Sequence, residues 1–122
     1  MSAASLLWIA LGGALGSVLR ALAGELLAAR FPWGTLAVNV AGSLLIGGVM
    51  ARLGGLEPEA AARLQALVVV GFCGGFTTFS AFSWQTVDQM LRGQWAAAAA
   101  NVALSLALCL GAAWLGFRLA RG

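Results

Sequence analysis

The sequence predicts an all-α membrane protein with four transmembrane helices and no separate soluble domain. Of its 122 residues, 61% are hydrophobic and only 9% are charged, whereas soluble domains carry about 25% charged residues. The mean hydropathy is +0.95, and a water-soluble core cannot bury that much apolar surface. A membrane-spanning helix needs roughly 20 residues, so residues 1–122 are expected to form a single four-helix transmembrane domain.

The first two predicted helices lie at about residues 6–27 and 33–50. No positively charged stretch precedes the first segment and three more apolar segments follow, which indicates a transmembrane helix rather than a removed leader. Pro32 opens the second segment at low cost, because the first helical turn does not use the N–H that proline lacks. The second segment is uncharged, and Asn39 is its most polar side chain.

The third and fourth helices are predicted at about residues 61–92 and 94–117, after a solvated connection at residues 52–63. The middle of the third helix contains two adjacent glycines, Gly74-Gly75, and two adjacent threonines, Thr77-Thr78. Glycine lowers helical propensity, and threonine hydroxyls compete for backbone carbonyls. The third helix is therefore expected to break near the middle of the membrane.

Four helices put both termini and the connection between the second and third helices on one side of the membrane. The seven arginines then divide four against three: Arg52, Arg63, Arg118 and Arg121 against Arg20, Arg30 and Arg92. Topology follows the bias of arginine and lysine between short loops, so this weak bias is compatible with insertion in both orientations. An antiparallel homodimer would then let two copies act as the inverted repeats of larger transporters.

The groups that enzymes use are missing from the apolar segments. The sequence has no histidine, and Cys73 and Cys109 do not have metal-ligand spacing. The four carboxylates lie near helix ends or in a connection: Glu25, Glu57, Glu59 and Asp88. Hydrolytic and redox catalysis lack their usual groups, so an enzyme is not expected. The arginines are scattered singly, and no basic patch indicates nucleic-acid binding.

Polar side chains inside the apolar segments are the candidates for function, because each must find a partner in a medium without water. They are Asn39, Thr77, Thr78, Ser80, Ser83, Asn101 and Ser105. One interpretation is a polar track, and the other is interhelical hydrogen bonding that only holds the bundle together. Phe76, Phe79 and Phe82 repeat every third residue. They form either a packing stripe or, through ring edges of partial positive charge, a surface for a small anion.

Three motifs of this sequence are similar to those of one known family. They are Gly12-Gly13-x-x-Gly16-x-x-x-Arg20, Gly34-Thr35-x-x-x-Asn39-x-x-Gly42-Ser43, and Gly71-Phe72-Cys73-Gly74-Gly75-Phe76-Thr77-Thr78-Phe79-Ser80-x-Phe82-Ser83. On these motifs, and over essentially its whole length, the chain closely resembles the Fluc/CrcB family of fluoride channels. The third motif is long and unusual enough to be strongly specific.

The resemblance implies a fluoride-selective channel that exports fluoride from the cytoplasm across the bacterial inner membrane. It also implies an antiparallel, dual-topology homodimer with two fluoride pathways and a structural sodium ion on the two-fold axis. By motif, backbone carbonyls of Gly74 and Thr77 would hold the sodium, and Arg20 would lie near the aqueous vestibule. The residues assigned to the fluoride pathway are Asn39, Thr78, Phe79, Ser80, Phe82 and Ser105.

A small multidrug exporter is the competing interpretation, because such proteins have a similar length, four helices and dual topology. Their proton-coupled transport depends on a carboxylate near the middle of the first helix, whereas Glu25 lies near the end of that helix and close to Arg20. A third interpretation is a non-transporting accessory subunit. It explains the small residues spaced four apart, which let helix backbones approach closely, but not the Gly-Gly-Phe-Thr-Thr run. These small residues are Gly12 with Gly16, Ser43 with Gly47, and Gly71 with Gly75.

Overall fold

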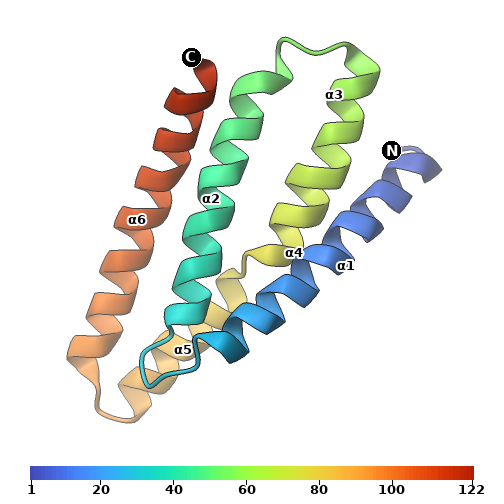
Figure 1. Ribbon diagram of the computed structural model, residues 1–122. Helices are drawn as coiled ribbons and strands as arrows, with labels where there is room; N and C mark the ends of the chain where they lie inside the picture. The colour runs from blue at the N-terminus through green and yellow to red at the C-terminus, as the bar shows by residue number, and fades with distance from the viewer.

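Four long apolar helices form the molecule, and the computed structural model describes all 122 residues (Figure 1). The helical elements in chain order are α1 (Ala3–Leu26), α2 (Trp33–Leu53), α3 (Pro58–Leu64), η1 (Gln65–Cys73), α4 (Gly74–Phe76), α5 (Phe79–Leu91) and α6 (Trp95–Arg121). Elements α3, η1, α4 and α5 together make one apolar span, Pro58–Leu91, which we call the third span. The prediction of four membrane-spanning helices is confirmed.

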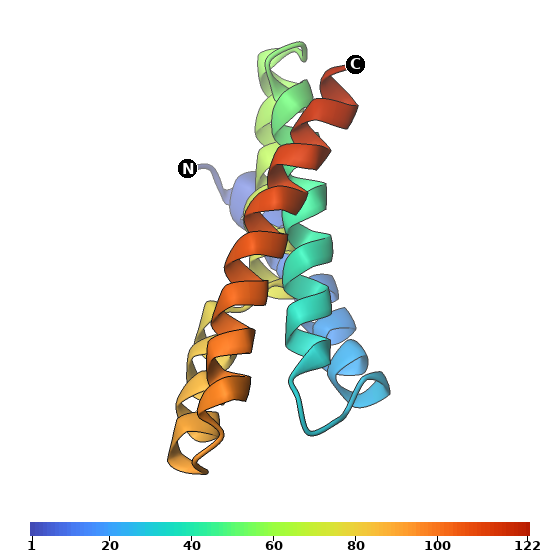
Figure 2. The same ribbon diagram turned by 90° about the vertical axis from the view of Figure 1, so that its left-hand side faces the viewer.

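The two ends of the bundle carry different parts of the chain. Both termini and the α2–α3 connection lie toward the top of Figure 1, and the α1–α2 and α5–α6 connections lie at the bottom. We call these the terminal end and the loop end. At the loop end Gly93 has φ +74°, a left-handed conformation that glycine adopts readily after a helix. Figure 2 shows α5 and the first half of α6 diverging from α1 and α2 toward this end.

Glycines bring two pairs of helices into close contact. The α1 helix lies mainly against η1 and α4, and α2 lies mainly against α6. A Cβ added at Gly71 of η1 would lie 2.8 Å from the carbonyl oxygen of Ile9 in α1. Gly47 of α2 and Gly116 of α6 face backbone of the opposite helix in the same way. Small residues let helix backbones approach within a membrane, where no hydrophobic effect drives helices together.

The third span breaks at Thr77 and Thr78, where the backbone is extended, with φ/ψ of −94°/157° and −152°/114°. The predicted break is confirmed, but the glycines do not form it. Gly74 and Gly75 are helical and follow the π-helical segment η1. A Cβ at Gly75 would lie 2.5 Å from the carbonyl oxygen of Gly13, so this glycine serves close packing on α1 rather than unwinding.

Candidate functional site

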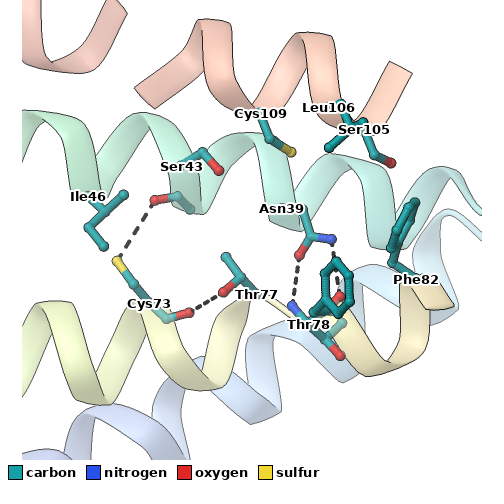
Figure 3. A pocket seen from close by; sticks show the side chains of 12 residues that line it. Asn39, Ser43, Ile46, Cys73, Thr77, Thr78, Phe82, Ser105, Leu106 and Cys109 are labelled. Carbon is teal, nitrogen blue, oxygen red and sulfur yellow. Dashed lines mark hydrogen bonds between the residues drawn. The ribbon is translucent and has the colours of Figure 1, made fainter. Parts of the chain in front are cut away.

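A chamber of about 320 Å³ lies beside the break in the third span, between α2 and α6 (Figure 3). Residues of α2, of the third span and of α6 line it: Asn39, Gly42, Ser43, Ile46, Cys73, Thr77, Thr78, Phe79, Phe82, Ser105, Leu106 and Cys109. Most of its wall is apolar, and the polar side chains converge on it from α2, the break and α6. An apolar cavity with a few oriented polar groups is the usual form of a small-ligand site.

Asn39 holds the break in place through both atoms of its side-chain amide. Its Nδ2 donates to the carbonyl oxygen of Thr78 at 3.2 Å, and its Oδ1 accepts from the backbone N–H of Thr78 at 2.8 Å. In an unbroken helix the Thr78 N–H would donate to the carbonyl of Gly74. The Nδ2 group carries two hydrogens, so one N–H of Asn39 remains for another acceptor at the chamber.

The two threonine hydroxyls at the break are engaged with nearby backbone. Thr77 Oγ1 donates to the carbonyl of Cys73 at 2.7 Å. Thr78 Oγ1 accepts from the N–H of Ala81 at 3.1 Å and so caps the N-terminus of α5. Thr78 Oγ1 also lies 3.2 Å from Ser80 Oγ. The break is therefore stabilised by its own side chains at both of its edges.

Phe79 and Phe82, on the first turn of α5, line the chamber. Their ring centroids are 5.5 Å apart and their planes are inclined by 49°. Phe79 is 77% exposed in the single chain, so much of its ring is available to a neighbour outside this subunit. A tilted pair presents ring edges, which carry partial positive charge, as well as faces.

A chain of hydrogen bonds leads away from the chamber along α5 and α6. Ser105 Oγ donates to Asn101 Oδ1 at 3.5 Å, and Asn101 Nδ2 donates to Thr86 Oγ1 at 3.0 Å. Thr86 Oγ1 donates in turn to the carbonyl of Phe82 at 2.8 Å. Asn101 is only 2% exposed. Ser105 and Asn101 share one face of α6, as their spacing predicted, and this network joins α6 to α5.

Arg20, Gly74 and Ser80 lie outside the chamber wall, unlike the other residues assigned to the site from the sequence. Arg20 Nε donates to the carbonyl oxygen of Gly75 at 2.9 Å. Gly75 precedes the break, so its carbonyl has no regular helical donor four residues later. The guanidinium thus supplies a donor to a backbone group that the break leaves free.

Comparisons with known proteins identify the family. The sequence model of a family described as "CrcB-like protein, Camphor Resistance (CrcB)" matches residues 7–117. The chain belongs to the CrcB family. It is 46% identical over 118 residues to a protein of Methylocella silvestris, covering 90% of this chain and 88% of the relative. It is 50% identical over 118 residues to a protein of Opitutus terrae, covering 90% and 87%. Both relatives are named "Fluoride-specific ion channel FluC".

Membership of the CrcB family confirms the resemblance drawn from the three sequence motifs and decides against a small multidrug exporter. The names of the relatives describe an ion channel and not an enzyme. Glu25, on which the exporter interpretation depended, lies exposed in the last turn of α1 and does not line the chamber.

Sequence reasoning did not assign Ser43 and Cys109 to the site, although both line the chamber of this CrcB chain. Ser43 lies four residues after Asn39 on α2, and Cys109 lies four residues after Ser105 on α6. Residues four apart share a helix face, so this spacing was the signal that was available.

Proposed function

We propose that this protein is a fluoride channel and that the chamber beside the break forms part of its fluoride pathway. The observation that carries the proposal is the arrangement of Asn39, which binds the broken backbone at Thr78 and keeps one N–H for an anion. The family and the names of its relatives support the same function. We assign the pathway to Asn39, Thr78, Phe79, Ser80, Phe82 and Ser105, with Arg20 at the vestibule.

The chemistry of the chamber suits a small, strongly hydrated anion. Such an ion gives up water only where the protein supplies replacement donors, and it must not be held too tightly to leave. The free N–H of Asn39, the hydroxyl of Ser43 and the edges of two phenyl rings are donors of moderate strength. No histidine or arginine lines the chamber, so no fixed cation traps the ion there.

We further propose that two chains assemble as an antiparallel homodimer in the membrane. The high exposure of Phe79 supports this assembly, because a second subunit would enclose this ring, which we assign to the pathway. The near-balanced arginines permit both insertions. Tags on the C-terminus should then be labelled from both sides of the membrane, and labelling of active protein from one side only would contradict the assembly.

A structural sodium ion at the dimer interface completes the proposal, with backbone carbonyls of Gly74 and Thr77 as its ligands. Asn39 takes the Thr78 N–H that would otherwise bind the Gly74 carbonyl, and Gly74 is exposed in the single chain. No group of carboxylates, cysteines or histidines is arranged to hold a metal, so carbonyls are the suitable donors. The ion would supply positive charge to carbonyl dipoles that lack hydrogen-bond donors in a dry interior.

The deciding experiment measures anion efflux from liposomes that contain the purified protein, with ion-selective electrodes for fluoride and for chloride. We expect rapid fluoride efflux and little chloride efflux. Equal rates for both ions, or efflux no faster than from protein-free liposomes, would contradict the proposed function. Replacing sodium with a large organic cation during prolonged exchange should reduce dimer retention as well as efflux.

A further inference from the structure

A second polar pocket lies at the loop end, at the opposite end of α5 from the break. It has a volume of about 280 Å³ and lies between the α1–α2 connection, which supplies Arg30, and the last turns of α5, which supply Gln85, Asp88, Gln89 and Arg92. Figure 2 shows these two parts of the chain diverging at this end, and the pocket spans the space between them. None of its residues lines the chamber.

The unpaired side-chain amide of Gln89 indicates that this pocket binds a ligand. Its side chain lines the pocket, the residue is only 5% exposed, and neither Nε2 nor Oε1 has a hydrogen-bond partner in the chain. Gln85 Oε1, in the same pocket, is also buried without a partner. A buried polar group left without a partner is destabilising, and nearly all such groups in folded proteins are paired. Nothing in the chain pairs with the Gln89 amide, and a partner from outside the chain would satisfy it.

The net charge of the pocket is positive, which favours an anionic ligand. Arg92 Nε binds Asp88 Oδ2 at 3.1 Å, whereas Arg30 forms no ion pair, since the only other pair in the chain joins Arg63 to Glu59. Two guanidiniums and one carboxylate leave one positive charge in excess. Arg30, Arg92 and the amide of Gln89 approach the pocket from two separate elements. A group with several acceptor oxygens, such as phosphate, suits donors that approach from two separate elements.

The pocket lies at the level of the membrane where the phosphate groups of lipids are found. It lies at a membrane end of the bundle, next to the connections that precede Trp33 and Trp95. Both tryptophans are exposed, and exposed tryptophans at helix ends mark the headgroup level of a bilayer. We propose that this pocket binds a phosphate group, with Arg30 as its charge partner and the Gln89 amide as its buried donor. The phosphate belongs either to a lipid headgroup or to inorganic phosphate.

The test measures binding to the delipidated, detergent-solubilised protein by native mass spectrometry and by thermal stabilisation. The probes are phosphatidylglycerol, diacylglycerol with the same acyl chains, inorganic phosphate and fluoride. We expect phosphatidylglycerol to bind and diacylglycerol not to bind. Binding of phosphatidylglycerol alone identifies a lipid headgroup as the source, and binding of inorganic phosphate as well identifies the phosphate group as sufficient.

Variants connect the binding to this pocket. Arg30→Gln and Gln89→Glu should each weaken phosphatidylglycerol binding at least about tenfold, because each removes a charged or buried hydrogen bond to the ligand. Arg30→Lys should retain most of the binding, and Arg121→Gln, at the terminal end, should retain all of it. Gln89→Glu preserves the size of the side chain, and Arg30 is exposed in a connection, so the two variants do not both depend on core packing.

Three results would overturn the proposal. They are equal binding of phosphatidylglycerol and diacylglycerol, binding of fluoride but of neither phosphate probe, and unchanged phosphatidylglycerol binding in both Arg30→Gln and Gln89→Glu. The proposal does not depend on fluoride transport, so these binding results stand apart from the efflux measurement.

Discussion

The two halves of the third span are held in different ways. Before the break, η1 and α4 lie with their backbones directly on α1, and glycines on both sides leave no room for side chains between them. After the break, α5 packs mainly on α6, through hydrogen bonds such as that from Asn101 to Thr86. This second half also contains the buried glutamines without partners in the chain.

The two halves therefore differ in what mainly holds them: contact with the α1 backbone in the first half, and side-chain hydrogen bonds to α6 in the second. Close backbone packing leaves little space for side chains between α1 and the first half, because glycines bring the two backbones into contact. A half that is positioned by side-chain hydrogen bonds carries polar groups, which the proposed fluoride pathway would use. Asn39 of α2 lies where the two halves meet, since its side chain forms two hydrogen bonds with the Thr78 backbone at the break.

The largest effect is expected from Asn39→Asp, which tests the contact between Asn39 and the break. A carboxylate retains the acceptor for the Thr78 N–H but loses the donor to the Thr78 carbonyl and repels an anion. Loss of buried hydrogen bonds costs about 1–3 kcal/mol each, so fluoride efflux should fall roughly 10- to 100-fold or more. The control is Gln65→Glu, which adds the same charge at the start of η1, away from the chamber. Normal efflux by correctly assembled Asn39→Asp protein would remove Asn39 from the pathway.

Gly75→Ala and Gly74→Ala are a matched pair of variants that tests the close packing of the third span on α1. The added methyl at residue 75 would lie 2.5 Å from the Gly13 carbonyl oxygen, whereas at residue 74 it meets nothing within 4 Å in the subunit. Overpacking costs about 1–3 kcal/mol, so Gly75→Ala should lower the free energy of unfolding of the subunit by that amount. Gly74→Ala should lower it by less than about 0.5 kcal/mol. Unfolding in a detergent titration, followed by circular dichroism, measures both, and equal losses would contradict the packing role of Gly75.

Arg20→Lys tests whether Arg20 contributes through its hydrogen bond to the Gly75 backbone or only through its charge. Lysine keeps the charge but lacks the Nε–H that donates to the Gly75 carbonyl at 2.9 Å. Loss of that bond should cost about 1 kcal/mol and reduce fluoride efflux about fivefold. Arg52→Lys is the control, because Arg52 Nε also donates to a backbone carbonyl, that of Ala120, at the exposed terminal end. If Arg20→Lys transports at the normal rate and Arg20→Gln does not, charge alone accounts for Arg20.

The smallest effect is expected from Thr77→Ser at the edge of the break. Serine retains the hydroxyl that donates to the Cys73 carbonyl and loses a methyl group that packs near Gly42, for a cost of at most about 0.8 kcal/mol. Thr77→Val keeps the shape and removes the hydrogen bond, so it should reduce thermal stability more. A greater loss in Thr77→Ser than in Thr77→Val would show that the methyl group, not the hydroxyl, stabilises the break.

Much of the fold followed from the sequence because it depends on local composition. Apolar segments of spanning length predicted four helices. The Gly-Gly-Phe-Thr-Thr run predicted a break, which the structure places at Thr77 and Thr78. The motifs also sufficed to identify the family. These features depend on the transfer of side chains into lipid and on the propensity of single residues, both of which act within one segment of chain.

The role of each glycine and polar group depends on which helix it faces in the folded bundle. Propensity indicated that Gly75 would unwind the helix, but contact with Gly13 of α1 keeps it helical and makes it a packing residue. Asn39 was predicted as a pore amide, and its binding of both backbone groups of Thr78 emerged only when α2 was placed beside the break. The unpaired amide of Gln89 was equally invisible in the sequence. Hydrogen-bond partners and close backbone contacts join residues that are distant in the chain, so their physical effect depends on how the helices pack and not on the segment that contains them.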